Sequence, residues 1–242
     1  MEIVRRHFET IGSTNTWAKE NAVTFNKSLL TLVTANAQTA GRGRFKRHWE
    51  SPPGHNIYAT YCFFVEKHRA DVGNIPQILA ISAAEVLSEC GLSPQLKWPN
   101  DVLLDKKKVG GILCETTPLS DQLCMIVGIG LNVNMTQEIL DAIGQPAASM
   151  QSVSGKSWDV DEVLEKLTRQ FVKNLEQFLE EGFLPFYKKY VELMKLSGEN
   201  IRFNDNRTIW EGTIDSIGTD GTLYLKLSDG NIRKFVCGEI LF

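Results

Sequence analysis

The 242-residue sequence lacks any long hydrophobic run. No stretch approaches the roughly 20 consecutive apolar residues that a membrane-spanning helix needs. The first residues, M-E-I-V-R-R, also contain no apolar segment of the kind found in a secretory signal. We therefore expect a cytoplasmic protein without a membrane partner.

The spacings that are typical of metal sites and redox centres are absent as well. The five cysteines include no C-x-x-C pair, and the four histidines show no H-E-x-x-H spacing. Most of the cysteines lie within apolar runs, which is typical of buried free thiols. The sequence predicts neither a disulfide framework nor a dedicated metal site.

Neither sign of charge is in large excess. Lys and Arg number 26 against 29 Asp and Glu, which gives a formal net charge of −3. Proteins that bind nucleic acid usually have a basic balance, so this composition argues against DNA or RNA as the main partner. The hydrophobic content of 43% is sufficient for a globular core, and the length fits one large domain with or without a small companion.

Positive charge is nevertheless concentrated in residues 41–49, which we call the basic loop. Between Gly41 and His48 it carries four basic side chains, two glycines and no carboxylate. Glycines let a ligand approach the backbone while cations converge on it, so this pattern favours a site for a compact anion. Trp49 adds a surface for stacking. The alternative is a solvated or non-specific nucleic-acid patch, which such clusters often form.

Hydrophobic periodicity predicts the elements around this loop. The expected elements are strands at 3–8, 29–35, 56–65, 109–115 and 125–134, a core helix at 73–90, and two short extended pieces within 96–104. Ser13 and Thr14 are well placed to cap a helix that follows them. Lys108 begins a strand with paired glycines, where a ligand can lie against the backbone.

The C-terminal part changes from helices to short strands. Asp159 and Glu162 predict the capped start of a long helix that ends at Gly182, and a second helix is expected at 183–196. Strands separated by Asp-Gly turns are then expected at 200–203, 208–217, 222–227 and 231–236. Short strands with tight turns predict a small barrel, which would form a second domain.

The run G-K-S at 155–157 is similar to the end of a phosphate-binding loop. That motif requires glycine at position 150, where this chain has Met150, and no apolar strand precedes it. We therefore expect residues 154–157 to form a surface loop.

Five motifs follow one another along the chain. They are S-T-N at 13–15, G-R-G-R-x-x-R-x-W-x-S-P-x-G-x-N at 41–56, K-W-P-N-D at 97–101, K-V-G-G-I-L at 108–113 and G-I-G-L-N at 128–132. Together with the C-terminal β-segment they resemble the biotin–protein ligases over nearly the whole chain. Two departures are Lys46, where many members have glycine, and Ile57, which replaces the usual leucine.

The resemblance implies an α+β fold. Residues 1–196 would form a class II synthetase-like, biotinyl/lipoyl-ligase catalytic domain with a mixed, largely antiparallel sheet and flanking helices. Residues 197–242 would form an SH3-like β-barrel. It also implies the reaction, in which biotin and ATP give biotinyl-5′-AMP, with Mg²⁺ bound to ATP, and biotin is then transferred to a lysine of a biotin carboxyl carrier domain.

The resemblance further implies roles for individual residues. The implied biotin-binding residues are Ser13, Thr14, Asn15, Gln38, Gly41, Arg42, Gly43, Arg44, Lys108, Gly111, Ile112, Leu113 and Gly128. Among them, Ser13, Thr14 and Gln38 would bind the ureido ring, and residues 111–113 with Gly128 would form the floor under the biotin rings.

The remaining implied roles concern charge and the nucleotide. The implied ATP-binding residues are Arg44, Arg47, Trp49, Lys108 and Asn132, and the implied catalytic residues are Arg42, Arg44, Lys108 and Asp101. Lys108 would bridge the biotin carboxylate and the α-phosphate, while Trp49 and Asn132 would face adenine and Arg47 the pyrophosphate. The role of Asp101 is our own hypothesis: it would orient or deprotonate the acceptor lysine, whose free pKa is near 10.4.

Two alternatives stay open from the sequence. Lipoate–protein ligases have a similar fold and reaction, although the basic motif favours biotin. A protein of another class, a non-catalytic nucleic-acid-binding module, could use the same basic loop. Only twelve residues precede Ser13, so we expect no DNA-binding module ahead of the catalytic part and no DNA partner. The resemblance also allows a homodimer.

Overall fold

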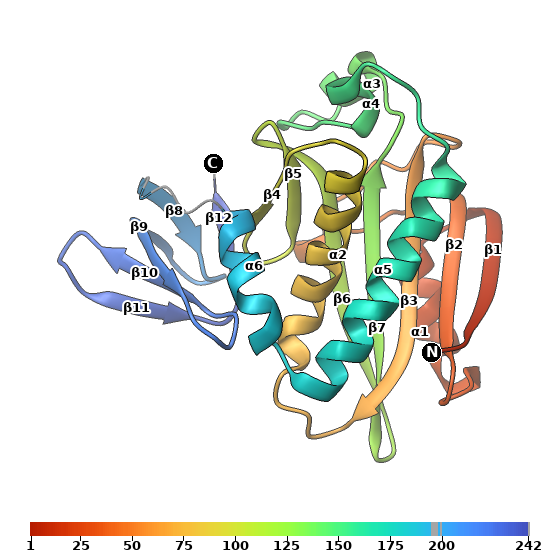
Figure 1. Cartoon of the computed structure of the whole chain (residues 1–242), viewed down its shortest axis with the longest axis horizontal. Helices are drawn as coiled ribbons and strands as arrows, with labels where there is room; N and C mark the ends of the chain where they lie inside the picture. The colour runs from red at the N-terminus through yellow and green to blue at the C-terminus, as the bar shows by residue number, and fades with distance from the viewer. Residues whose placement is uncertain (195–197, 199, 242) are drawn as a thin grey trace.

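The protein combines a large mixed sheet with a second, small sheet. A computed structural model describes residues 1–194, 198 and 200–241 (Figure 1). The large sheet has seven strands in the order β1-β2-β3-β7-β6-β5-β4, and the small sheet has five strands in the order β11-β10-β9-β8-β12. This architecture confirms the predicted α+β class with a mixed, largely antiparallel sheet and an additional small β-structure.

The large sheet is organised around β3 and β7. Its strands are β1 (Ile3–Ile11), β2 (Leu30–Gln38), β3 (Asn56–Glu66), β4 (Pro94–Lys97), β5 (Asp101–Leu104), β6 (Lys107–Leu119) and β7 (Gln122–Asn132). β1 and β2 pair in parallel, and the other neighbours pair antiparallel. Nine of the eleven residues of β3 are buried, which explains its nearly continuous apolar sequence.

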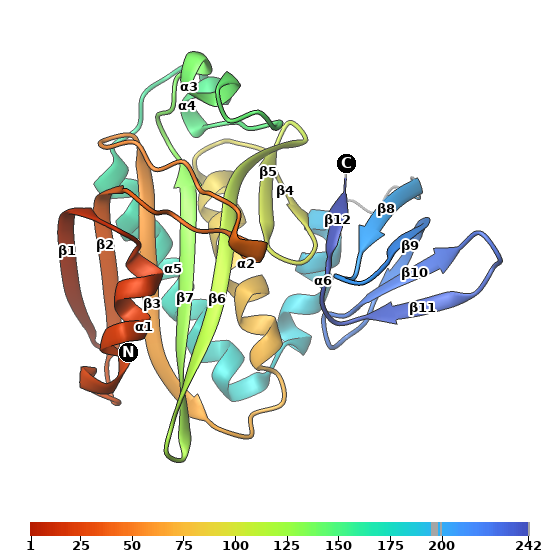
Figure 2. The same cartoon turned by 180° about the vertical axis from the view of Figure 1, so that it is seen from behind.

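Helices cover both faces of this sheet. α1 (Thr14–Asn21) lies on one face, and α2 (Ile75–Glu89) and α5 (Val160–Glu181) lie on the other (Figures 1 and 2). α5 begins and ends as predicted. The Asp159 carboxylate accepts the N–H of Glu162 at 3.0 Å, and Gly182 ends the helix with a φ of 74°.

The small sheet contacts the rest of the protein at Gly221, in the turn between β9 and β10. Its strands are β8 (Asn200–Asn204), β9 (Ile209–Ile217), β10 (Leu223–Leu227), β11 (Ile232–Phe235) and β12 (Glu239–Leu241), and α6 (Leu184–Met194) precedes them. The Gly221 carbonyl accepts hydrogen bonds from Trp98 Nε1 at 3.0 Å and Gln77 Nε2 at 2.9 Å. The small sheet is therefore fixed against α2 and the K-W-P-N-D segment.

Several short elements were not predicted. These are β12, α3 (Gln137–Asp141), α4 (Met150–Ser154), and the 3₁₀ turns η1 (Ala22–Thr24), η2 (Arg44–Lys46) and η3 (Val72–Asn74). Ser154, which we expected in a surface loop, is instead the last residue of α4. The Ser149 hydroxyl caps this helix by accepting the N–H of Ser152 at 2.9 Å.

Two further expectations concern the domain boundary and a membrane-spanning helix. The predicted boundary between residues 196 and 197 lies outside the described residues, as does the end of the predicted helix at 183–196. Within the part of the chain that the structure describes, no helix has the length and apolar character to cross a membrane.

Candidate active site

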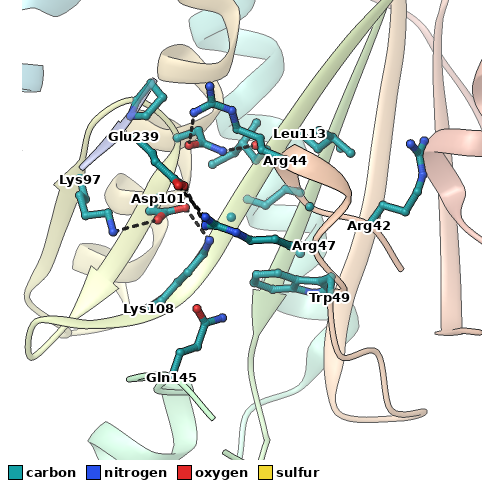
Figure 3. A pocket seen from close by; sticks show the side chains of 18 of the residues that line it. Arg42, Arg44, Arg47, Trp49, Lys97, Asp101, Lys108, Leu113, Gln145 and Glu239 are labelled. Carbon is teal, nitrogen blue, oxygen red and sulfur yellow. Dashed lines mark hydrogen bonds and ion pairs between the residues drawn. The ribbon is translucent and has the colours of Figure 1, made fainter. Parts of the chain in front are cut away.

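A cavity of about 300 Å³ opens beside the basic loop, β6 and β7 (Figure 3). This volume is in the range of small-molecule sites. The predicted residues that line it are Ser13, Thr14, Asn15, Gln38, Arg42, Gly43, Arg44, Arg47, Trp49, Asp101, Lys108, Gly111, Ile112, Leu113 and Gly128. The fold thus brings five separate motifs of the sequence to one place.

The basic loop folds back on itself instead of forming an irregular connection. Arg42 and His48 form an isolated antiparallel bridge, and the N–H of Trp49 donates to the carbonyl of Gly41 at 3.0 Å. At the tip, Phe45 adopts a left-handed conformation with a φ of 57°. These contacts fix the backbone of the basic loop, from which its three arginine side chains extend.

One wall of the cavity consists of neutral hydrogen-bonding groups. Ser13 caps α1 by accepting the N–H of Thr16 at 3.4 Å, as predicted, and it also lines the cavity. Gln38 Oε1 accepts from the backbone N–H of Thr14 at 2.9 Å and from its hydroxyl at 3.2 Å. Hydroxyl and amide groups side by side offer both donors and acceptors, which suits a polar ring.

The floor of the cavity depends on the absence of a side chain at Gly128. Asn15 Nδ2 donates to the Leu113 carbonyl at 3.0 Å, and Asn15 Oδ1 accepts from the Thr60 hydroxyl at 2.7 Å. A Cβ atom at Gly128 would lie 2.0 Å from Asn15 Oδ1. Glycine is required here for close packing, because any side chain would displace Asn15.

The opposite wall is charged. The Asp101 carboxylate lies between two ammonium groups, with Lys108 Nζ at 2.6 Å and Lys97 Nζ at 3.5 Å. Burial lowers the pKa of Lys97, and the charge of Asp101 opposes this shift. Figure 3 shows the three side chains pointing toward one another from β4, β5 and β6.

Two arginines of the basic loop are held by the C-terminal strand β12 and the residue before it. Arg44 donates to the Gly238 carbonyl at 2.8 Å, and Arg47 makes two bonds to the Glu239 carboxylate, at 2.7 Å and 2.5 Å. Burial lowers the pKa of Arg44, while the carboxylates of Glu239 and Asp101 oppose the shift. Arg42 points away from this group (Figure 3).

Trp49 and Lys108 line both the main cavity and a smaller hollow of about 120 Å³, which Asn132 also lines. The Trp49 ring lies against β7, since a Cβ atom at Gly130 would be 2.3 Å from Trp49 Nε1. This Nε1 is buried without a hydrogen-bond partner among the described residues. A buried indole N–H normally has a partner, so Trp49 Nε1 is an exception among the described residues.

Two predicted residues lie outside the lining of the main cavity. Gly41, the first residue of the basic loop, is buried, and a Cβ atom there would be 2.4 Å from the Trp49 carbonyl oxygen. Asn132 is buried, donates to the Ala148 carbonyl at 3.0 Å, and borders only the smaller hollow of the two described here.

Lys97 and Glu239 line the charged wall, and neither received a role from the sequence. Lys97 belongs to the K-W-P-N-D motif, so that motif could have pointed to it. No local sequence pattern indicates a role for Glu239, because its partner Arg47 is 192 positions away in the chain.

The two walls together suit a molecule with a polar ring at one end and an anionic group at the other. Converging cations stabilise negative charge that develops on a carboxylate or phosphate during a reaction. Among the described residues there is no group of three or more His, Cys, Asp or Glu side chains that could hold a metal ion.

A family model and characterised relatives match this chain. The model of the "Biotin/lipoate A/B protein ligase family" matches residues 7–132. The "Bifunctional ligase/repressor BirA" of Bacillus spizizenii is 30% identical over 248 residues, covering 99% of this chain and 75% of the relative. The chain spans between 64% and 75% of the length of the first four such relatives.

Two further matches have lengths closer to that of this chain. The "Biotin--[acetyl-CoA-carboxylase] ligase" of Paracoccus denitrificans is 30% identical, with 87% of this chain and 89% of the relative covered. Among solved structures, the "Biotin protein ligase from Aquifex aeolicus in complex with biotin and ATP" aligns with a TM-score of 0.82 and 32% identity. That alignment covers 99% of this chain and 97% of the Aquifex chain.

Proposed function

Because the chain belongs to the biotin/lipoate A/B protein ligase family, we propose that it attaches biotin to a lysine of a carrier protein in two steps. In the first step, a biotin carboxylate oxygen attacks the α-phosphorus of ATP, the bond to the β-phosphate breaks, and pyrophosphate leaves. In the second step, the neutral lysine amine attacks the acyl carbon, the acyl–oxygen bond breaks, and AMP leaves while the amine loses a proton.

The observation that carries this proposal is that a single cavity has a neutral hydrogen-bonding wall and a charged wall. We assign the neutral wall, with Ser13, Thr14 and Gln38, to the ureido ring. We assign the floor at Gly128 to the apolar body of biotin. The biotin carboxylate would then extend toward Lys108, where the charge of the first step develops.

The nucleotide would occupy the charged wall and the smaller hollow. We assign the α-phosphate to Lys108 and Arg44, the adenine to Trp49 and Asn132, and the pyrophosphate to Arg47. Mg²⁺ would enter with the triphosphate and neutralise part of its charge. Because Arg47 is already paired with Glu239, the incoming phosphates compete with this carboxylate for the guanidinium.

The carrier and the domain organisation complete the proposal. We propose a biotin carboxyl carrier domain as the acceptor, and the cytoplasm as the place where the enzyme meets it and ATP. We also propose that residues 1–196 and 197–242 are two domains that share one site, since Arg44 and Arg47 bond to Gly238 and Glu239.

Direct observation of both products tests the proposal. The purified chain is incubated with biotin, ATP and Mg²⁺, the adenylate is followed by chromatography, and a biotin carboxyl carrier domain is then added and weighed by mass spectrometry. We expect biotinyl-5′-AMP first and a carrier one biotinyl group heavier afterwards. An unmodified carrier and no adenylate would contradict the proposal. If lipoate in place of biotin labelled the carrier and biotin did not, the chain would be a lipoate ligase.

Gly128→Ala is expected to raise the KM for biotin by about tenfold or more. The added methyl group displaces Asn15 and breaks buried hydrogen bonds, each of which contributes about 1–3 kcal/mol when a partner is lost, and 1.4 kcal/mol corresponds to about a factor of ten. Pyrophosphate release at increasing biotin concentration measures the effect.

Gly73→Ala is the matched control for this substitution. A Cβ atom at Gly73 meets nothing within 4 Å, so its KM should equal that of the parent enzyme. If Gly128→Ala also leaves the KM for biotin within twofold of the parent value, biotin does not lie on this floor.

A further inference from the structure

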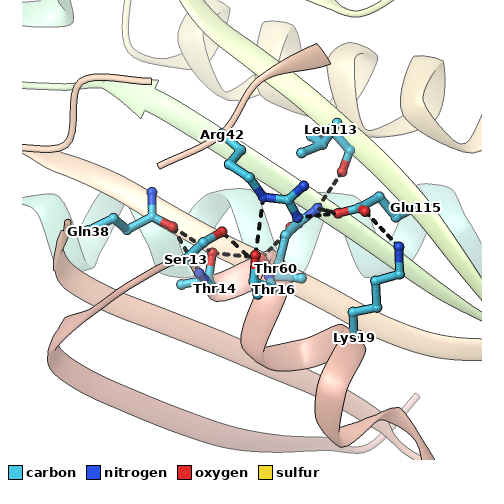
Figure 4. A network of polar contacts seen from close by, with 10 residues as sticks. Ser13, Thr14, Thr16, Lys19, Gln38, Arg42, Thr60, Leu113 and Glu115 are labelled. Carbon is cyan, nitrogen blue, oxygen red and sulfur yellow. Dashed lines mark hydrogen bonds and ion pairs between the residues drawn. The ribbon is translucent and has the colours of Figure 1, made fainter. Parts of the chain in front are cut away.

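Glu115 is a charged residue outside the cavity that contacts both the basic loop and the cavity wall. It lies on β6, and its carboxylate has three partners: Arg42 Nη2 at 2.9 Å, Lys19 Nζ at 3.1 Å and Asn15 Nδ2 at 3.4 Å (Figure 4). Arg42 belongs to the basic loop, and Asn15 packs against Gly128 at the floor of the cavity. None of the sequence motifs includes Glu115.

The partners of Glu115 are themselves fixed to the site. Arg42 Nε donates to the Thr16 hydroxyl at 3.1 Å, so the guanidinium is held by α1 as well as by β6. On the other side, the Thr60 hydroxyl contacts Asn15 Oδ1 at 2.7 Å and the Thr14 hydroxyl at 2.9 Å. A continuous chain of polar contacts thus connects the basic loop to the groups assigned to the ureido ring.

The surroundings of Glu115 distinguish it from an ordinary surface ion pair. Its side chain is 17% exposed, whereas the ion pair of Arg5 and Glu165 leaves its two side chains 47% and 50% exposed. Burial tends to raise the pKa of Glu115, but the hydrogen bond from Lys19 and the charge of Arg42 outweigh burial, so the pKa lies below its ordinary value. The carboxylate is therefore charged at neutral pH and attracts Arg42 in a partly dry environment.

We infer that Glu115 is the positioning residue of the basic loop: by holding Arg42 against α1, it keeps the start of the loop over the biotin end of the cavity. Arg44 and Arg47 are held separately by Gly238 and Glu239, so the two halves of the loop have independent attachments. The inference rests on the proposed function, because its effect is expressed in biotin binding and in retention of the adenylate.

Glu115→Gln tests this role with minimal change in shape. The amide keeps the size of the side chain but loses the charge that attracts Arg42. We expect the KM for biotin to rise by about tenfold, the factor that loss of one charge-assisted hydrogen bond commonly causes, while kcat at saturating biotin stays within about twofold of the parent value, because Lys108 and Asp101 are unchanged. We also expect more biotinyl-5′-AMP to pass a filter that retains the protein.

Two comparisons make the result specific. Glu165→Gln removes the same charge from an exposed pair and should change neither the KM nor the retention of the adenylate. In an Arg42→Ala background, Glu115→Gln should have no further effect on the KM, since the partner is already absent. An unchanged KM in the single variant, or an equal further loss in the Arg42→Ala background, would overturn the inference.

A second variant covers the case in which Glu115→Gln does not fold. Thr16→Val removes the other acceptor of Arg42 and leaves Glu115 in place. A raised KM for biotin with increased leakage of the adenylate supports the inference, and parent values overturn it. If the parent chain itself makes no biotinyl-5′-AMP, the proposed function fails. This outcome differs from a raised KM and from an unchanged KM in the variants.

Discussion

Lys108→Ala is expected to lower the rate of biotinyl-5′-AMP formation by about 10²–10³-fold, the loss that follows removal of one positioned stabilising group in other enzymes. Lys108 Nζ lies 2.6 Å from Asp101, and its side chain lines both the main cavity and the smaller hollow. An ammonium group in this place can neutralise charge shared by the biotin carboxylate and the α-phosphate, whereas alanine cannot. Pyrophosphate release at saturating biotin and ATP measures the rate.

Lys107→Ala provides the matched control. Lys107 precedes Lys108 in β6, is exposed, and lies outside the lining of either cavity described here, so its removal should leave the rate near that of the parent. A Lys108→Ala rate within tenfold of the parent, which is about 1.4 kcal/mol of barrier, would show that Lys108 does not bridge the two reacting groups.

Asp101→Asn is expected to slow the second step by about 10²–10⁴-fold, the usual contribution of a positioned general base. The Asp101 carboxylate is only partly exposed and faces Lys97 and Lys108 across the charged wall. The acceptor lysine must enter this wall as an ammonium and lose a proton before it attacks, and a carboxylate can hold and accept that proton. The neutral amide of asparagine cannot accept it.

The second step is measured with preformed biotinyl-5′-AMP and a carrier domain, which bypasses the first step. Asp105→Asn is the control, because Asp105 is an exposed residue of the neighbouring turn, and its left-handed backbone, with a φ of 49°, is one that asparagine tolerates. Full transfer by the Asp101→Asn enzyme would show that Asp101 neither accepts the proton nor orients the acceptor lysine.

Local sequence signals predicted most of the elements because each has a periodic pattern and a recognisable end. α5 shows this best, because Asp159 indicated its start and Gly182 its end. α3 and α4 have only five residues each, too few for a periodic pattern to be visible. β12 has three residues, and its pairing with β8 is a long-range contact that local sequence does not encode.

The site could be predicted in part for a related reason. The motifs around Ser13, Arg44 and Lys108 are compact, so their residue types indicated polar-ring and anion binding before their arrangement was known. Glu115 and Glu239 could not be found in this way. Each acts on an arginine 73 or 192 positions away, and only the folded sheet brings the charges within bonding distance.

The bonds from Arg44 to Gly238 and from Arg47 to Glu239 span 194 and 192 positions of the chain. At a synthesis rate of about 5–20 residues per second, the arginines are synthesised roughly 10–40 s before their partners. During that interval the contacts of the basic loop with Asn100 and Glu115 can form, but those with Gly238 and Glu239 cannot. The charged wall is therefore completed only after Gly238 and Glu239 have been synthesised.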